Sequence, residues 1–255
     1  DLNAASMEDL RKFYKTYYSP GNAVLVIGGS FRTEDAKKLI EKFYAGIPKE
    51  EINRPAVVAE AEQTSERRAT IDREAQAPTL VISYRLPDLN SKDHFALDLL
   101  AIVLGRGQSS RLYKQLVYKK ELALSASVSS WGQVLSGQFS IGASLKPKGD
   151  TDKLVKLIEE QVGAMRSKPV SQKELDKARN ILMKDYVDGL KQMSGRAHQL
   201  ASYEILYGDY RRIFTDLKEY GQVSVADIQR VAQAYLQPKA RNIVIVHPRK
   251  PGGAT

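Results

Sequence analysis

One stretch of the sequence occurs twice, in the same order and without a gap. Residues 6–27 read SMEDLRKFYKTYYSPGNAVLVI, and residues 224–245, an offset of 218 positions (224 minus 6), read SVADIQRVAQAYLQPKARNIVI. The serine, the aspartate, a tyrosine, the proline and a final Val-Ile stand at matching positions. Each copy has a Ser-x-x-Asp cap, apolar residues three and four apart, a proline stop and β-branched residues. This pattern predicts a helix followed by a strand.

A repeated helix–strand unit also predicts how the chain is organised. We expect it to begin with the end of one repeat and then to contain nearly all of the next. The end of the preceding repeat is expected over 1–48, a linker over 49–66, a second repeat domain over 67–250 and a loose tail over 251–255. Residues 49–66 are taken as a linker because they hold prolines and acids without a clear period. A chance match between unrelated helix–strand units is the alternative.

Secondary-structure patterns point to one fold class. In the first part, a helix is expected over 7–18, an apolar strand over 23–28 and a helix over 34–45 capped by Thr33. In the second part, strands are expected over 67–73, 78–86, 122–131, 136–146 and 241–247, and helices over 92–104, 109–120, 151–166, 171–192, 195–207 and 224–236. Paired strands separated by blocks of helices are typical of an α+β fold. We therefore expect a mostly antiparallel sheet with helices packed on one face.

Composition excludes several classes of function. The formal charge is +9, but Lys and Arg alternate with Asp and Glu, as in QKELDKAR at 172–179, which is typical of solvated helix faces. We therefore expect no nucleic-acid partner. Cysteine is absent, which removes disulfides and thiolate chemistry and fits either the bacterial periplasm, slightly favoured, or the cytoplasm. No apolar run reaches the roughly 18–20 residues of a membrane span.

The residues that usually carry catalysis form no recognisable constellation. The histidines are His94, His198 and His247, and none has metal-ligand spacing to another. Asp98 lies one helical turn from His94, but two ligands make a poor zinc site. Ser109-Ser110 follows a glycine-containing loop and is interpreted as an N-cap pair. That loop, LGRGQ at 104–108, resembles half of a dinucleotide fingerprint, but it follows a helix, so a helix–helix connector is the alternative.

Four stretches together resemble the second half of a pitrilysin/insulinase-family zinc metallopeptidase subunit of the mitochondrial-processing-peptidase type. They are SMEDLRKFYKTYYSPGNAVLVIGG, GRGQSSRLYKQLVYKKELALSASVSS, SGQFSIGASLKPKGDTDKLVKLIEEQ and SQKELDKARNILMKDY. The resemblance covers most of residues 6–190. It implies tandem α+β repeats, of which the first carries an inverted H-x-x-E-H zinc motif and the second is non-catalytic. None of the zinc-motif residues is in this sequence, so no catalytic or metal-binding residue is expected here.

The resemblance also suggests residues that could line a substrate cleft. Second repeats of the family carry an Arg and a Tyr seven apart, in a pattern like Leu-Arg-Glu-x-x-Gly-Leu-Ala-Tyr, that contact the substrate backbone. Here those two positions hold Val117 and Leu124, which cannot donate such hydrogen bonds. Both could instead be buried core residues. The remaining cleft candidates are Gly105, Arg106 and Gly107 in the glycine-containing loop.

The resemblance implies a function and a set of partners. We expect the zinc-free C-terminal half of a zinc endopeptidase, which encloses a peptide substrate and mediates subunit pairing. Zinc would belong to an N-terminal catalytic half, and the Arg/Tyr pair to a related partner subunit, unless the protein forms a homodimer. A scaffold subunit of the same fold without peptidase activity is one alternative, and an unrelated α+β binding module is another.

Overall fold

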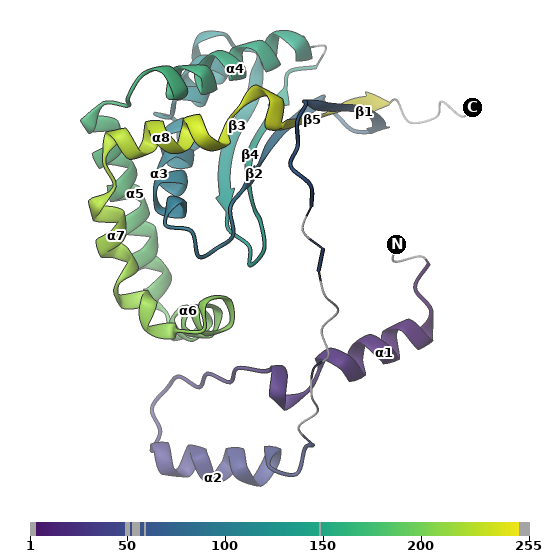
Figure 1. The fold of residues 1–255 in the computed structure, drawn as a ribbon, viewed down its shortest axis with the longest axis vertical. Helices are drawn as coiled ribbons and strands as arrows, with labels where there is room; N and C mark the ends of the chain where they lie inside the picture. The colour runs from purple at the N-terminus through teal and green to yellow at the C-terminus, as the bar shows by residue number, and fades with distance from the viewer. Residues whose placement is uncertain (1–3, 49–51, 53–56, 59, 148, 250–255) are drawn as a thin grey trace. The chain divides into compact units, whose positions relative to one another are not determined.

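The computed structural model describes residues 4–48, 52, 57–58, 60–147 and 149–249. Part of the expected linker (49–51, 53–56 and 59) and the tail 251–255 therefore lie outside the described residues. The chain divides into two compact units (Figure 1). The first unit contains residues 1–60 and 188–213, and the second contains 61–187 and 214–255. The helical stretch 188–213 thus groups with the N-terminal segment, which the repeat pattern did not suggest.

The second unit is built on one five-stranded sheet. The strands are β1 (Arg67–Glu74), β2 (Thr79–Leu86), β3 (Ala123–Trp131), β4 (Gly137–Leu145) and β5 (Arg241–Arg249), in the order β1-β5-β2-β4-β3. All pairs are antiparallel except β1 with β5. The predicted α+β fold with a mostly antiparallel sheet is therefore confirmed. The last strand lies inside this sheet, between two strands from the start of the unit.

Helices cover one face of the sheet (Figure 1). Helix α3 packs on β3 and on α8, and α8 also contacts α4 and β2. The helices and single turns of this unit are α3 (Asp93–Gly105), η3 (Tyr113–Lys119), α4 (Thr151–Ser167), α5 (Gln172–Lys191, which continues into the first unit), α7 (Asp216–Gln222), α8 (Val225–Tyr235) and η5 (Pro238–Ala240). Asp150 caps α4, and Ser171 and Glu174 form a capping box at the start of α5. Helix α7 was not predicted, because its seven residues carry little periodic signal.

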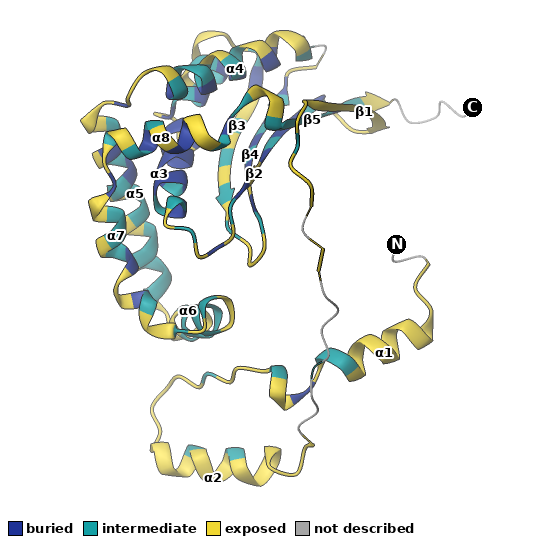
Figure 2. Ribbon diagram, in the orientation of Figure 1, coloured by how far each residue is buried: buried dark blue, intermediate teal, exposed yellow. Residues whose placement is uncertain are grey.

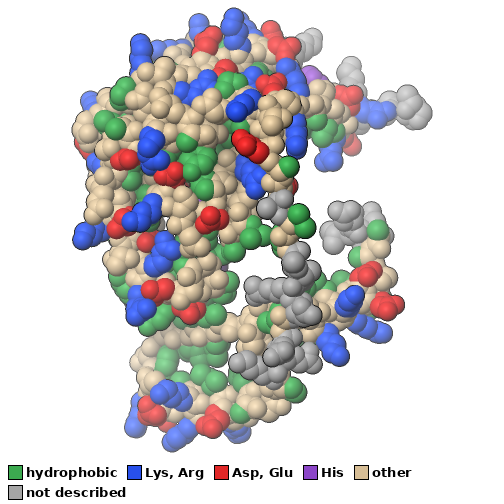
Figure 3. All heavy atoms as spheres, viewed as in Figure 1, with side chains coloured by type: hydrophobic (Ala, Val, Ile, Leu, Met, Phe, Trp, Pro, Cys, Tyr) green, Lys and Arg blue, Asp and Glu red, His purple; other side chains and the backbone are tan. Residues whose placement is uncertain are grey.

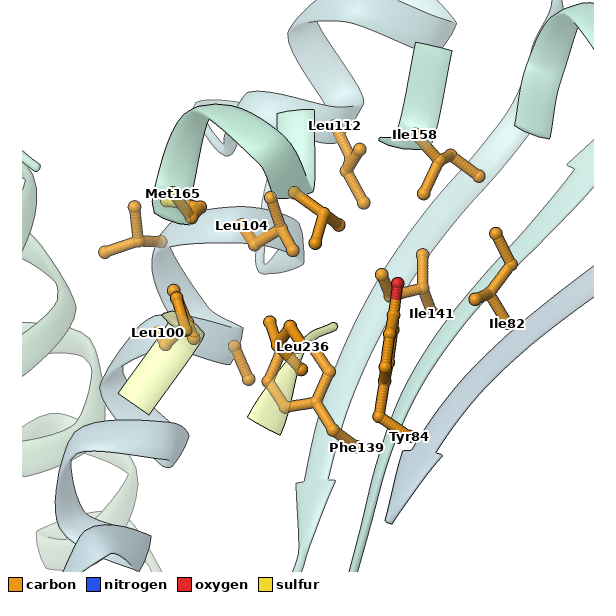
Figure 4. Packing of buried hydrophobic residues seen from close by; sticks show 14 of the residues in the cluster. Ile82, Tyr84, Leu100, Leu104, Leu112, Phe139, Ile141, Ile158, Met165 and Leu236 are labelled. Atoms are coloured by element: carbon orange, nitrogen blue, oxygen red, sulfur yellow. The ribbon is translucent and has the colours of Figure 1, made fainter. Parts of the chain in front are cut away.

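The hydrophobic core lies between these helices and the sheet (Figures 2 and 4). Alternate residues of β2 and β4 point into it, including Ile82, Tyr84, Phe139 and Ile141. Helix α3 is buried on nearly all sides, since ten of its thirteen residues are buried. Such a helix must be surrounded by protein, which agrees with its place between the sheet, α8 and α7.

The first unit is organised differently. It contains α1 (Met7–Tyr17), η2 (Pro20–Asn22), α2 (Thr33–Tyr44), α6 (Met193–Tyr207) and η4 (Tyr210–Phe214). Neither α1 nor α2 has a buried residue (Figure 2). Thr33 is the first helical residue of α2 rather than its cap, and Arg32 at the cap position makes no side-chain capping bond. None of the described helices combines the length and hydropathy required to cross a membrane.

The strand predicted over 23–28 is wrong for this chain. These residues pair with none of the described strands. The apolar run has the composition of a buried strand, but a strand exists only where a neighbouring strand supplies hydrogen bonds. Leu25 and Ile27 are instead exposed. At Gly28, an added Cβ would lie 2.6 Å from Met193 Sδ of α6.

Candidate functional site

The face of the sheet that points away from the helices carries small side chains in its middle, next to a row of larger ones formed by Arg85, Gln138 and Trp131. Across β3, β4 and β2, Ser129 lies opposite Ser140, and Ser140 lies opposite Ser83. Two residues further along each strand, on the same face, Ser127 lies opposite Gly142, and Gly142 lies opposite Val81. We call this the open face, because no helix of the second unit covers it among the described residues (Figure 1). Small hydroxyl-bearing side chains project only a short distance from the sheet and supply hydrogen-bonding groups.

The open face ends at an edge strand without the usual protection. Among the described strands, β3 pairs only with β4. Its nine residues, ALSASVSSW, include no charge and no proline, the two devices that most often prevent further strand pairing. Leu124 and Trp131, near its two ends, are both exposed. The outer backbone groups of β3 are therefore chemically suited to pair with an extended peptide.

The glycine-containing loop lies beside this strand. Gly105 is the buried last residue of α3, and a Cβ there would lie 2.2 Å from Val128 Cγ2 and 2.5 Å from the Val128 backbone nitrogen. Gly107 has φ +77° with open space around it. Ser110 is fully buried and donates a hydrogen bond to the Gly107 carbonyl (2.7 Å). These contacts support the connector interpretation of the loop and explain both glycines by packing and backbone conformation.

Arg106, the third candidate in the loop, makes a structural ion pair. Its Nη2 lies 2.5 Å from Asp185 Oδ2 of α5, and the arginine side chain is half exposed. The guanidinium therefore ties the end of α3 to α5. A side chain engaged in this way is less available to a substrate, so the structure gives no separate support for Arg106 as a cleft residue.

Val117 and Leu124 lie on two different elements with different surroundings. The helix expected over 109–120 is a π-helix in its main part, η3, where the Lys120 amide donates to the Gln115 carbonyl five residues back. Val117 is half-buried and packs against the core, whereas Leu124 is 56% exposed beside a register shift in β3. The alternative that both are buried core residues is therefore wrong for Leu124. Between them, Glu121 has φ +50°, which turns the chain from η3 into the edge strand.

The described residues do not fit a zinc ion. They contain no group of three or more His, Cys, Asp or Glu side chains arranged to hold a metal. His94 is buried and its Nε2 lies 2.8 Å from the Asp88 carbonyl oxygen. Asp98 accepts a hydrogen bond from the Tyr220 hydroxyl (2.7 Å), and burial raises the pKa of its carboxyl. His94 thus holds α3 to the loop that precedes it, and Asp98 holds α3 to α7.

A basic depression lies beside the π-helix η3 and the start of α5. It has a volume of about 470 Å³ and includes Lys114, Lys119, Lys173 and Lys177 in its lining. Lys177 donates to the Ser109 hydroxyl (2.9 Å), and its pKa is lowered by burial and by the nearby charge of Lys114. Elsewhere the charges of both signs are interspersed, as Figure 3 shows for one face of the molecule. This interspersion agrees with the expectation of solvated helix faces.

Glu174 and Arg111 form the strongest ion pair in this depression. Arg111 Nε and Nη2 donate to the two carboxylate oxygens at 2.8 and 3.0 Å, and Glu174 also accepts the Ser171 backbone amide at 2.9 Å. The Arg111 hydrogen bonds lower the pKa of Glu174 to about 2 from the usual 4.5. Arg111 lies 63 residues away from Glu174 in the sequence, so no local pattern predicts this pair.

We expect Glu174→Gln to remove part of the acid dependence of stability. A carboxyl whose folded-state pKa is depressed stabilises the fold above its ordinary pKa and loses that contribution as the pH falls from about 4.5 to about 2. The variant should therefore melt at a lower temperature than the natural chain above pH 5, and the two should converge near pH 2. The loss should be roughly 1–2 kcal/mol, because the pair is partly exposed. Glu160→Gln, at an exposed site on α4, is the control; an equal loss there would contradict the assignment.

Comparison with known proteins places these features in a family. The family model described as "Peptidase M16 inactive domain" matches residues 4–182. The chain is 28% identical over 258 residues to the zinc protease PqqE of Helicobacter pylori, covering 97% of this chain and 56% of that protein. A solved protease from Helicobacter pylori superposes with a TM-score of 0.90 at 25% identity, over 97% of this chain and 60% of that one.

A third match lies almost entirely within this chain. The solved inactive peptidase domain from Bordetella parapertussis is 30% identical and has a TM-score of 0.64, with 71% of this chain and 97% of that one covered. By contrast, the chain spans about half the length of the curated relatives it matches. The matches therefore concern one half of those longer proteins.

Proposed function

Because the chain belongs to the peptidase M16 inactive-domain family, we propose that it is the zinc-free half of a zinc endopeptidase and that its open face helps to enclose the peptide substrate. Its homology to zinc proteases and the absence of a metal-binding group among the described residues support this assignment. In this arrangement the zinc and the general base belong to a catalytic half. The contribution of this half is to position the substrate and to exclude water from it.

The observation that carries the proposal is the open face itself. Helices occupy one side of the sheet, while the other presents the Ser129, Ser140 and Ser83 row and ends at the unprotected strand β3. Arg85, Gln138 and Trp131 form the neighbouring row at one end of this face. Beyond that row, small hydroxyl-bearing residues leave space for a chain passing over the sheet.

The test is to fill that space in a longer natural protein that contains this chain and cleaves peptides. Ser140 lies in the middle of the open face, between β2 and β3. Ser140→Trp should lower kcat/KM for long peptides by about 10-fold or more, because a bulky side chain displaces the substrate from the catalytic half. Very short peptides should be affected less. Ser167→Trp, at an exposed site at the end of α4, supplies the same chemical change away from the sheet.

Two outcomes would contradict the proposal. If Ser140→Trp and Ser167→Trp give the same kinetics while both melt like the natural protein, the open face does not meet substrate. If the longer protein, supplied with zinc, hydrolyses no peptide alone or with any related subunit, the scaffold interpretation is correct instead.

A further inference from the structure

The basic depression beside η3 holds more positive charge than the side chains around it neutralise. It is formed by residues 109–119, by α4 and by the start of α5, whereas the open face is formed by strands. We propose that this depression binds a multivalent phosphate anion, free in solution or carried by a lipid headgroup. The proposal goes beyond the proposed function, because it involves neither the open face nor catalysis.

The positive charge of the depression is uncompensated. Four lysines of its lining form no ion pair with a carboxylate of the described residues: Lys114, Lys119, Lys173 and Lys177. Glu174 is the one acidic side chain in the lining that the structure describes. Both of its carboxylate oxygens already accept hydrogen bonds from Arg111. The depression therefore presents four positive charges that the described part of the chain leaves without a counter-charge.

A second depression shows how this chain otherwise treats clustered positive charge. It lies along α4, has a volume of about 580 Å³ and contains three arginines. Each of them is paired with a carboxylate: Arg68 with Asp152, Arg166 with Glu159, and Arg241 with both Glu159 and Glu66. The chain therefore supplies acids to one cluster of positive charge and not to the other. A missing set of acids is what a site for an external anion requires.

Lys177 shows that holding this charge is costly. Its side chain is half-buried, and burial together with the nearby charge of Lys114 lowers its pKa. Its ammonium donates to two neutral oxygens, the Ser109 hydroxyl at 2.9 Å and the Ser109 carbonyl at 3.2 Å. An anion placed in the depression would stabilise the charged form of this lysine. The Ser109 hydroxyl accepts from Lys177 and can still donate its own proton to such an anion.

The available donors suit phosphate better than carboxylate. The planar fork of an arginine matches a carboxylate, but Arg111 is already engaged in this way with Glu174. The remaining cations are lysines, which bind phosphate oxygens as flexible point charges. Four of them favour an anion of more than one charge. The lining that the structure describes contains no aromatic side chain on which a base could stack, so charge is the feature that is recognised.

Titration of the 255-residue chain with inorganic pyrophosphate tests the proposal. Pyrophosphate should raise the Tm and bind once per chain in isothermal titration calorimetry, with an affinity that falls as NaCl is added. Lys114→Gln combined with Lys173→Gln should weaken binding by about 10-fold or more, because two charged donors are lost. Both side chains are exposed and bond to none of the described residues, so the variant should fold normally.

The control removes the same charge from another part of the same unit. Lys153→Gln combined with Lys156→Gln changes two exposed lysines of α4 outside the depression and should leave binding unchanged. Equal weakening in the two double variants would mean a diffuse attraction to a positively charged protein and would overturn the proposal.

Vesicles of phosphatidylcholine with and without phosphatidic acid distinguish the two sources of phosphate. Binding to the phosphatidic acid vesicles but not to pyrophosphate, lost only in the Lys114 and Lys173 variant, would identify a lipid headgroup as the ligand. Binding to pyrophosphate but not to the vesicles would identify a free anion. If the chain binds neither probe, the proposal is wrong.

The stability of the unliganded chain gives a second readout. Lys114→Gln removes a charge that acts against Lys177, so at low salt it should leave the Tm unchanged or raise it slightly. The same substitution should reduce the rise in Tm that pyrophosphate causes. A lower Tm without ligand, with pyrophosphate still raising it as much as in the natural chain, would show that Lys114 supports the fold and would contradict a role in binding.

Discussion

Gly105→Ala should lower the melting temperature of the second unit far more than Gly107→Ala does. Gly105 touches the edge strand, where an added Cβ would lie 2.2 Å from Val128 Cγ2, 2.6 Å from Val128 Cβ and 2.5 Å from the Val128 backbone nitrogen. A side chain could rotate away, but the backbone of β3 is held by its pairing with β4. Overpacking of this kind should cost about 3 kcal/mol. For a domain of this size, that corresponds to a fall in Tm of roughly 6–12 °C.

Gly107→Ala is the matched control two residues away. Its φ of +77° is unfavourable for alanine, but nothing lies within 4 Å of the added Cβ. The strain alone should cost about 1 kcal/mol. Thermal melts followed by circular dichroism would measure both variants. If Gly107→Ala were as damaging as Gly105→Ala, the close approach of α3 to β3 would be disproved as the reason for glycine at 105.

A double substitution separates the side-chain contact from the backbone contact. Val128→Ala removes the Cγ2 atom nearest to the new Cβ, so it should restore part of the stability lost in Gly105→Ala. The restoration should be incomplete, because the Val128 backbone nitrogen and Cβ remain in place. A positive interaction energy in this double-mutant cycle would show that residues 105 and 128 are coupled.

These two glycines also show what a sequence can and cannot predict. The sequence pattern placed both glycines in one loop, but only Gly107 has the positive φ that is typical of a loop glycine. Gly105 is glycine because a strand that begins 18 residues later passes against it, a contact between distant parts of the chain. Local patterns predicted the five strands of the sheet and most helices, because amphipathic periods and capping boxes depend on residues that are only a few positions apart. The order of the strands depends on tertiary packing and was not predicted.

The candidate site shows the same division between local and distant information. Strands over 122–131 and 136–146 were predicted from the local pattern, but only the register shows that Ser129, Ser140 and Ser83 form one row. The apolar run 23–28 was predicted as a strand on good local grounds. It is not one here because a strand needs a neighbour, and the described residues provide none.

The largest change in activity that we expect comes from replacing Val117 and Leu124. We propose that these positions correspond to a substrate-binding Arg and Tyr in related subunits and that a partner subunit supplies the missing pair. In a longer natural protein without that partner, Val117→Arg combined with Leu124→Tyr should raise kcat/KM by about 10-fold or more, because side-chain donors position the scissile bond. Initial rates on an extended peptide would measure the gain.

The structure indicates how each residue should tolerate this change. Leu124 is exposed on the edge strand, so a tyrosine can be placed there without disturbing the core. Val117 is half-buried against the core, and an arginine there must extend its charged end to solvent. Leu124→Tyr alone should therefore leave Tm nearly unchanged, while Val117→Arg should lower it. Melting each variant first distinguishes lost folding from lost binding.

The control moves the same two side chains one residue along the same elements. Tyr118→Arg combined with Ser125→Tyr places an arginine on η3 and a tyrosine on β3, on neighbouring faces that are already exposed. Both double variants add one arginine and one tyrosine, and the control also removes the exposed ring of Tyr118, so a gain limited to positions 117 and 124 would have to come from their location or from that ring; Tyr118→Arg alone measures the effect of losing the ring. Equal gains in the two variants would contradict a specific role. A longer protein that is fully active without a partner, and gains nothing from either change, would show that its substrate site is complete without this pair.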